Sequence, residues 1–146
     1  MSLNEQLYQR WLLQLQTWAA DGRLFSAGVD ALRLKPGQAT NKLTRITNRL
    51  AKGDTQDLPP IELLPVSAMP GAAGAYAEST GKIYLNKNWL SKATLKQTIS
   101  VLTEEFGHHL DQIINNRDTA GDEGLSLSNH LTREEEEEGI ETDNRR

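Results

Sequence analysis

The stretch VLTEEFGHHLDQ, residues 101–112, lies in the longest helical pattern of the chain and decides its fold. Apolar side chains recur there at steps of three and four from about residue 92 to residue 115, which predicts one long amphipathic helix. Glu104 and His108 are four residues apart, so they project from the same side of this helix, with Glu105 beside them. The apolar stripe consists of Leu95, Ile99, Leu102, Phe106, Leu110 and Ile113.

Gly107 is unusual within this helix. Glycine inside a helix costs about 1 kcal/mol relative to alanine, so its presence usually has a packing reason. We expect another segment to approach the helix closely at Gly107.

The first third of the chain is expected to be helical. Residues 3–19 carry apolar side chains at helical spacing, including Trp11 and Trp18, and a shorter helical piece is expected at residues 27–33. Another helix is expected around residues 43–50, ended by Gly53. The tryptophan stripe is expected to be core, with a partner-binding face as the alternative.

The middle of the chain predicts a small antiparallel sheet. Residues 61–67 read as a strand, and Pro65 favours an edge position or an early end for it. Two short apolar stretches, residues 75–77 and 83–85, flank the turn residues Ser79, Thr80 and Gly81, which indicates a hairpin. The predicted fold class is therefore α+β, with N-terminal helices, a small antiparallel sheet or hairpin, and one long helix.

Length and composition predict one domain. The chain has 146 residues, which suits a single domain at residues 1–133, with a helical part at 1–53 and the sheet and long helix within 58–133. Residues 134–146 form an acidic tail that opens with five consecutive glutamates, and such a run is typical of a solvated, disordered end.

Charge and residue usage exclude several classes of function. The net charge is -4, and thirteen of the twenty acidic residues lie in residues 104–146, so a nucleic-acid partner is not expected. No apolar run approaches the ~20 residues of a membrane helix, and the N-terminus has no signal-peptide pattern, so no membrane partner is expected. Without cysteine, any metal must be held by histidine and carboxylate.

The stretch TEEFGHHLD resembles the active-site helix of the zincin metallopeptidases, whose motif is H-E-x-x-H. In that family two histidines bind zinc and the glutamate between them is the general base for an attacking water. The resemblance implies that His108 is a metal ligand and Glu105 the catalytic base. Glu104 stands where the zincins have their first histidine, so the motif here is E-E-x-x-H.

A wider span, from about residue 48 to residue 123, resembles a domain of large secreted bacterial proteins, especially cyanobacterial ones of the haemolysin-type calcium-binding kind. That resemblance covers about half the chain and carries E-E at the same place in the helix. It implies a zincin-like, metal-dependent hydrolase module that acts outside the cell.

A carboxylate in the first ligand position is compatible with a metal site. Carboxylate oxygen is an accepted zinc ligand, although an oxygen-rich donor set shifts the preference toward manganese, magnesium or calcium. The cofactor expected is a divalent metal, with zinc first and calcium or manganese as alternatives. Its predicted ligands are Glu104, His108 and, from the loop after the helix, Glu123, with Asp118 as the second choice for the third position.

Other polar residues near the motif are given supporting roles. Asp111 follows His108 by three residues and can accept the second ring N–H of its imidazole. His109 is expected to be a core-edge histidine with one hydrogen bond, and His130 a surface residue.

Two functions of different classes follow from these residues. The first is a metallopeptidase-like hydrolase that acts on a peptide or protein substrate, with residues 82–86 as the strand edge for an extended peptide. The second is a non-catalytic structural or binding module of a secreted toxin or adhesin, with an acidic cluster that calcium stabilises.

Overall fold

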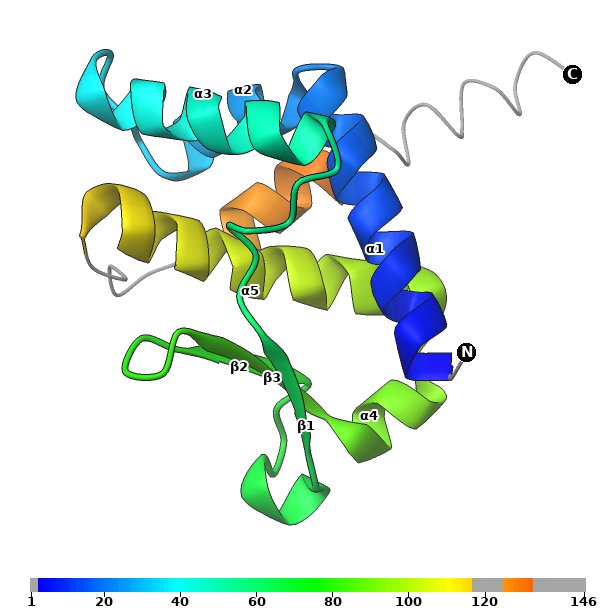
Figure 1. Cartoon of the computed structure of the whole chain (residues 1–146). Helices are drawn as coiled ribbons and strands as arrows, with labels where there is room; N and C mark the ends of the chain where they lie inside the picture. The colour runs from blue at the N-terminus through cyan, green and yellow to red at the C-terminus, as the bar shows by residue number, and fades with distance from the viewer. Residues whose placement is uncertain (1–2, 117–124, 133–146) are drawn as a thin grey trace, which may run out of the picture.

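A long helix lies between a small sheet and a layer of helices (Figure 1). The computed structural model describes residues 3–116 and 125–132. The predicted α+β class is confirmed. In chain order the elements are α1 (Leu3–Ala20), α2 (Arg23–Ala31), α3 (Gln38–Ala51), β1 (Ile61–Leu64), the 3-10 helix η1 (Val66–Ala68), β2 (Gly74–Ala77), β3 (Lys82–Asn86), α4 (Lys87–Lys92) and α5 (Leu95–Asn115), and residues 125–132 are also helical.

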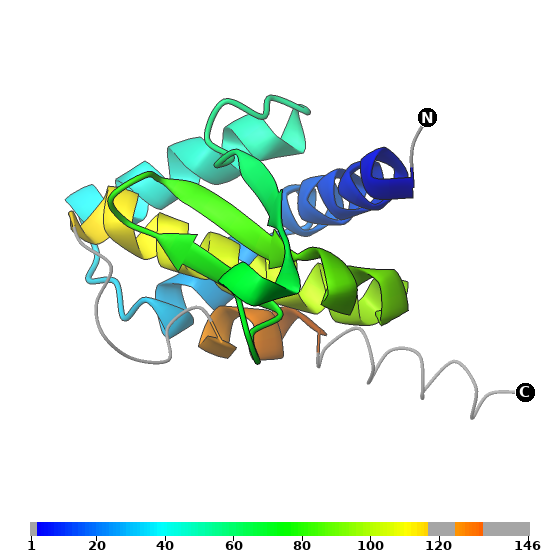
Figure 2. The same ribbon diagram turned by 90° about the horizontal axis from the view of Figure 1, so that it is seen from below.

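Helix α5 is the centre of the fold. Figure 1 shows α2 and α3 on one side of α5 and the sheet on the other, and α1 runs from the side of α2 and α3 past the first turns of α5 toward α4. Figure 2 shows the sheet in front of α5. The helix at residues 125–132 packs beside α5, where the Ser128 hydroxyl donates to the Ser100 carbonyl at 2.9 Å. This additional helix was not predicted from the sequence.

The tryptophan stripe of α1 is core. Trp11 is 0% and Trp18 1% exposed. The Trp11 ring meets Phe106 of α5 edge-on, at 5.9 Å between ring centroids, and its indole N–H donates to the Thr103 hydroxyl at 3.3 Å. The alternative of a partner-binding tryptophan face is therefore wrong, because both tryptophans are buried inside the protein and Trp11 packs against α5.

The long helix predicted from about residue 92 to residue 115 is confirmed as α5, which begins at Leu95, and the short helix α4 precedes it. Asn86 caps α4, since its side-chain oxygen accepts from the backbone N–H groups of Asn88 and Trp89. Thr94 then begins α5 with a capping box, in which its hydroxyl accepts from Gln97 N and the Gln97 side chain accepts from Thr94 N. Leu95, expected in the buried stripe, is 38% exposed at this first turn.

The sheet is mixed rather than wholly antiparallel. Its strand order is β1-β3-β2; β2 and β3 form the predicted antiparallel hairpin, whereas β1 pairs with β3 in parallel. The edge position expected for residues 61–67 is confirmed, and β1 stops just before Pro65. The edge expected at residues 82–86 is wrong, because β3 is the central strand and β2 takes the other edge.

Candidate functional site

The motif residues occupy two successive turns of α5. Glu104 and His108 are both partly exposed, whereas Glu105 is 7% and Asp111 1% exposed. On an ideal helix Glu104 and His108 are separated by about 40° around the axis, and Glu105 and His108 by about 60°. The two partly exposed donors therefore lie on one side of α5, beside two buried carboxylates.

Strand β2 runs alongside this part of α5. A Cβ atom at Gly74 would lie 2.7 Å from Val101 Cγ1, closer than real Cβ contacts, so glycine permits the approach of the strand. Further along β2, the Tyr76 ring contacts the His109 ring edge-on, with centroids 5.4 Å apart. The motif turns of α5 therefore face an edge strand of the sheet.

His109 is fixed by hydrogen bonds at both ring nitrogens. Its Nε2 lies 3.1 Å from the Asp57 carbonyl oxygen, which can only accept, so Nε2 carries the proton and donates. In the neutral ring Nδ1 is then unprotonated, and it lies 2.9 Å from the Tyr76 hydroxyl, whose one proton can go to Nδ1 or to Gln112 Oε1. Burial lowers the pKa of His109, which favours this neutral form, while the Asp57 hydrogen bond opposes the shift.

These bonds belong to a longer polar network. Asp57 is held by Arg49 of α3, with Arg49 Nε 2.7 Å from Asp57 Oδ2 and the Arg49 second nitrogen 2.9 Å from Asp57 Oδ1. The Tyr76 hydroxyl also contacts Gln112 Oε1, and Gln112 Nε2 donates to the Glu78 carbonyl at 3.2 Å. The network ties α3, β2 and α5 together next to His108. His109 is therefore structural, as expected, but with two hydrogen bonds rather than one.

Only two of the three predicted metal ligands lie in the part of the chain that the structure describes. Glu104 and His108 lie in the described chain, whereas Glu123 and Asp118, the candidates for the third ligand, lie outside it. Within residues 3–116 and 125–132, no group of three histidine, cysteine, aspartate or glutamate side chains is placed to hold a metal ion. The third ligand thus stays a prediction.

The supporting residues can be placed more fully. Asp111 Oδ1 accepts from Asn115 Nδ2 at 2.6 Å, and its expected contact with His108 stays a prediction. His130 is exposed on the helix at residues 125–132, as expected of a surface histidine. Gly107 is buried, and the close approach of another segment expected there stays a prediction.

Sequence reasoning missed Tyr76 and Asp57. Neither residue is part of a recognisable motif, and each is brought to His109 by long-range contacts, across 33 and 52 residues of chain. The only signal in the sequence was the aromatic residue on a short strand, which is equally typical of ordinary sheet packing.

The chain has no match among protein-family models, characterised proteins or solved structures. No helix of the described part of the chain combines the length and the apolar character needed to cross a bilayer.

Proposed function

We propose that this protein is a metal-dependent hydrolase of the zincin-like type, acting on peptide bonds. The observation that supports the proposal best is the position of Glu104 and His108. They are partly exposed on one side of α5, one helical turn apart, with the buried carboxylate of Glu105 between them in sequence. Carboxylate and imidazole donors at this spacing are a usual basis for a divalent metal site.

The residues present fit a metal by their donor chemistry. Glu104 offers oxygen and His108 nitrogen, and Glu123 would supply the third donor from the segment after α5. Burying carboxylates next to an imidazole is costly unless hydrogen bonds or a cation compensate them. Glu105 and Asp111 are both buried beside His108, and a cation held at His108 would add to the interactions that these carboxylates already make.

A divalent ion held there would act as a Lewis acid that polarises the scissile carbonyl and acidifies water. Glu105 would take a proton from the attacking water and return it to the leaving amine. Asp111 would orient His108 by accepting its second ring N–H. The network around His109 would keep this part of α5 at a fixed distance from β2.

The substrate we propose is an extended peptide. Strand β2 lies at the sheet edge and alongside the motif turns of α5. An edge strand recognises an extended peptide through main-chain hydrogen bonds, whatever its side chains. The residues of α5 that contact β2 include Val101, His109 and Gln112, so a peptide added to β2 would lie near the motif turns.

Metal titration of the purified full chain tests the ligand set. After removal of metal with a chelator, we expect zinc to bind at one site, with manganese and calcium weaker. His108→Gln and Glu104→Gln should each reduce zinc affinity by at least tenfold. His130→Gln removes an exposed histidine elsewhere and is the matched control. Equal loss of affinity in His130→Gln and His108→Gln would overturn the ligand assignment.

Cleavage of a peptide library, read by mass spectrometry, tests the chemistry. We expect cleavage to depend on added metal, and Glu105→Gln to abolish cleavage while it leaves metal bound. Turnover that survives Glu105→Gln would show that this carboxylate is not the base.

The second function, a non-catalytic module stabilised by calcium, is favoured by one observation. Thirteen of the twenty acidic residues lie in residues 104–146, and carboxylate oxygens are ligands that calcium prefers. For this function, calcium at a hundred times its Kd should raise the free energy of unfolding by about 2.7 kcal/mol, because it binds only the folded chain. The melting temperature should rise accordingly. Zinc binding and peptide cleavage would then both be absent.

A further inference from the structure

A cavity of about 410 Å³ lies between α1, the sheet, α4 and the start of α5. Volumes of roughly 300 to 1,000 Å³ are typical of small-molecule sites. On an ideal helix Leu102, in the cavity wall, points about 160° away from Glu104 and about 120° away from His108. The cavity is therefore separate from the candidate metal site, and a ligand bound there is independent of the hydrolase function.

Most of the described cavity lining is aliphatic. Its deep wall consists of leucines that are almost fully buried, and its outer wall of partly exposed aliphatic side chains of α1 and β1. Water held in a cavity needs about two to four polar partners, whereas an aliphatic molecule needs none and gains from leaving water. The six aliphatic residues are Leu85, Leu90 and Leu102 in the deep wall and Leu7, Ile61 and Leu63 in the outer wall.

The three polar residues of the described lining do not select a charged ligand. Thr98 donates its hydroxyl to the Thr94 carbonyl at 3.0 Å, and burial raises the pKa of Tyr8, so the Tyr8 hydroxyl is neutral at physiological pH. Glu5 is exposed and already takes part in an interaction of its own. None of the described lining residues is basic, so a carboxylate finds no counter-charge among them.

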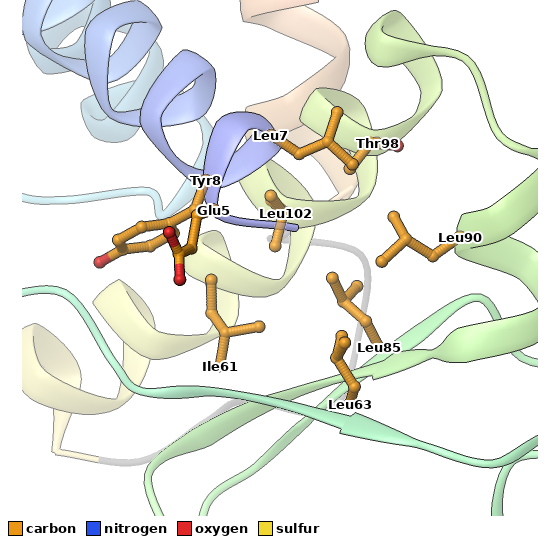
Figure 3. A pocket seen from close by; sticks show the side chains of 9 residues that line it. All are labelled: Glu5, Leu7, Tyr8, Ile61, Leu63, Leu85, Leu90, Thr98 and Leu102. Carbon is orange, nitrogen blue, oxygen red and sulfur yellow. The ribbon is translucent and has the colours of Figure 1, made fainter. Parts of the chain in front are cut away.

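A charged group would therefore lose its hydration in this cavity without an ion pair to compensate it. An uncharged group avoids that cost. The polar side chains also give the cavity a direction, since Figure 3 shows Glu5 and Tyr8 side by side near Ile61, with the leucines at the other end. The neutral Tyr8 hydroxyl can donate or accept a hydrogen bond there.

We propose that this cavity binds an uncharged aliphatic molecule of medium length, such as a straight-chain alcohol. Its alkyl chain lies along the leucines, and its hydroxyl group lies at the end that holds Tyr8.

Calorimetric titration of the full chain with 1-octanol, octanoate and octylammonium at neutral pH tests the proposal. We expect 1-octanol to bind at least tenfold more tightly than either charged compound. Burying one CH₂ group changes affinity by about fourfold, so 1-hexanol should bind about fifteenfold more weakly than 1-octanol. N-acetylleucinamide, which offers an aliphatic side chain between two amide groups, should bind at least tenfold more weakly than 1-octanol.

Three variants localise the binding. Leu63→Phe should fill the outer wall and weaken 1-octanol binding by at least tenfold, and Leu7→Phe should do the same from α1 if Leu63→Phe does not fold. Glu5→Gln should leave 1-octanol affinity within twofold and keep the preference for 1-octanol over octylammonium. Leu13→Phe is the control, since Leu13 is 60% exposed on α1 and is not among the lining residues.

Circular dichroism melts should show that each variant used is folded. The proposal is overturned by the absence of saturable 1-octanol binding, or by octanoate or octylammonium binding as tightly as 1-octanol. N-acetylleucinamide binding as tightly as 1-octanol would overturn it in favour of a peptide side chain as the occupant. Equal weakening by Leu13→Phe and Leu63→Phe would also overturn it, because binding would then be unspecific adsorption to exposed apolar surface.

Discussion

Gly74 holds the edge strand β2 against the motif helix, and Gly74→Ala tests that contact. The added Cβ would lie 2.7 Å from Val101 Cγ1 and 3.3 Å from the Tyr84 carbonyl oxygen. Carbon atoms pack at about 3.5 to 4.0 Å, so the strand and the helix must separate by roughly 1 Å. Because Val101 is β-branched and Tyr84 contributes backbone, neither can turn aside easily.

The size of the effect follows from two opposing contributions. Overpacking of a core contact costs about 1 to 3 kcal/mol. Replacing glycine by alanine restricts the unfolded chain, which returns about 0.4 to 1 kcal/mol. We expect a net loss of about 1 to 2 kcal/mol in the free energy of unfolding, which corresponds to a fall of roughly 2 to 8 °C in melting temperature.

Urea denaturation followed by circular dichroism measures this loss, and two comparisons make it specific. Gly28→Ala is the matched control: its Cβ would lie 2.8 Å from Leu43 Cδ2, the end of a side chain that can rotate away, and alanine favours the helix. We expect Gly28→Ala to be close to neutral. In a Val101→Ala background, Gly74→Ala should cost at most half as much as in the wild type.

Two results would refute the reasoning. One is a Gly28→Ala variant as unstable as Gly74→Ala, which would show that any added methyl group has the same effect. The other is a Gly74→Ala cost that Val101→Ala does not reduce, which would place the strain elsewhere.

Three further predictions concern stability. Burial lowers the pKa of His109, so the folded protein disfavours the charged imidazole, and the free energy of unfolding should fall as pH drops below the ordinary value of 6.5 and level off below the folded pKa. His109→Gln should flatten this part of the pH profile measured by urea denaturation, and an unchanged slope would contradict the shift. Thr103→Val leaves the buried Trp11 N–H without its acceptor and should cost about 1 to 3 kcal/mol in urea denaturation, whereas a neutral result would mean that the bond is dispensable. Thr94→Ala removes the cap of α5 and should lower stability by about 1 kcal/mol in the same assay, while Thr44→Ala, on an exposed face of α3, should change it less.

The polar network around His109 links stability to the candidate site. His109 adjoins His108, and its two hydrogen bonds connect α5 to β2 and to the segment before β1. Loss of the Tyr76 hydroxyl would therefore remove the hydrogen bond between the motif turns and the sheet. In the proposed hydrolase, that would disturb the position of Glu105 relative to a peptide on β2.

Local patterns in the sequence determined α1, α3, α5 and the hairpin. The spacing of Trp11, Leu15 and Trp18 was sufficient to predict α1 and its buried side, and turn residues between two apolar stretches predicted the hairpin. The placement of Glu104, Glu105 and His108 on neighbouring turns of one helix also followed from their spacing. Each of these features depends on residues that are close together in the chain, within one or two helical turns or one tight turn, so it can be predicted from the sequence without knowledge of long-range contacts.

Only the tertiary structure decided which of these elements meet. The parallel pairing of β1 with β3, the edge position of β2, the two partners of His109 and the cavity beneath α1 all join residues far apart in the chain. Such contacts depend on which faces pack and in which register, and an alternating or amphipathic pattern is compatible with several choices. The buried area and hydrogen bonds of the whole fold select one of them, which local periodicity cannot do.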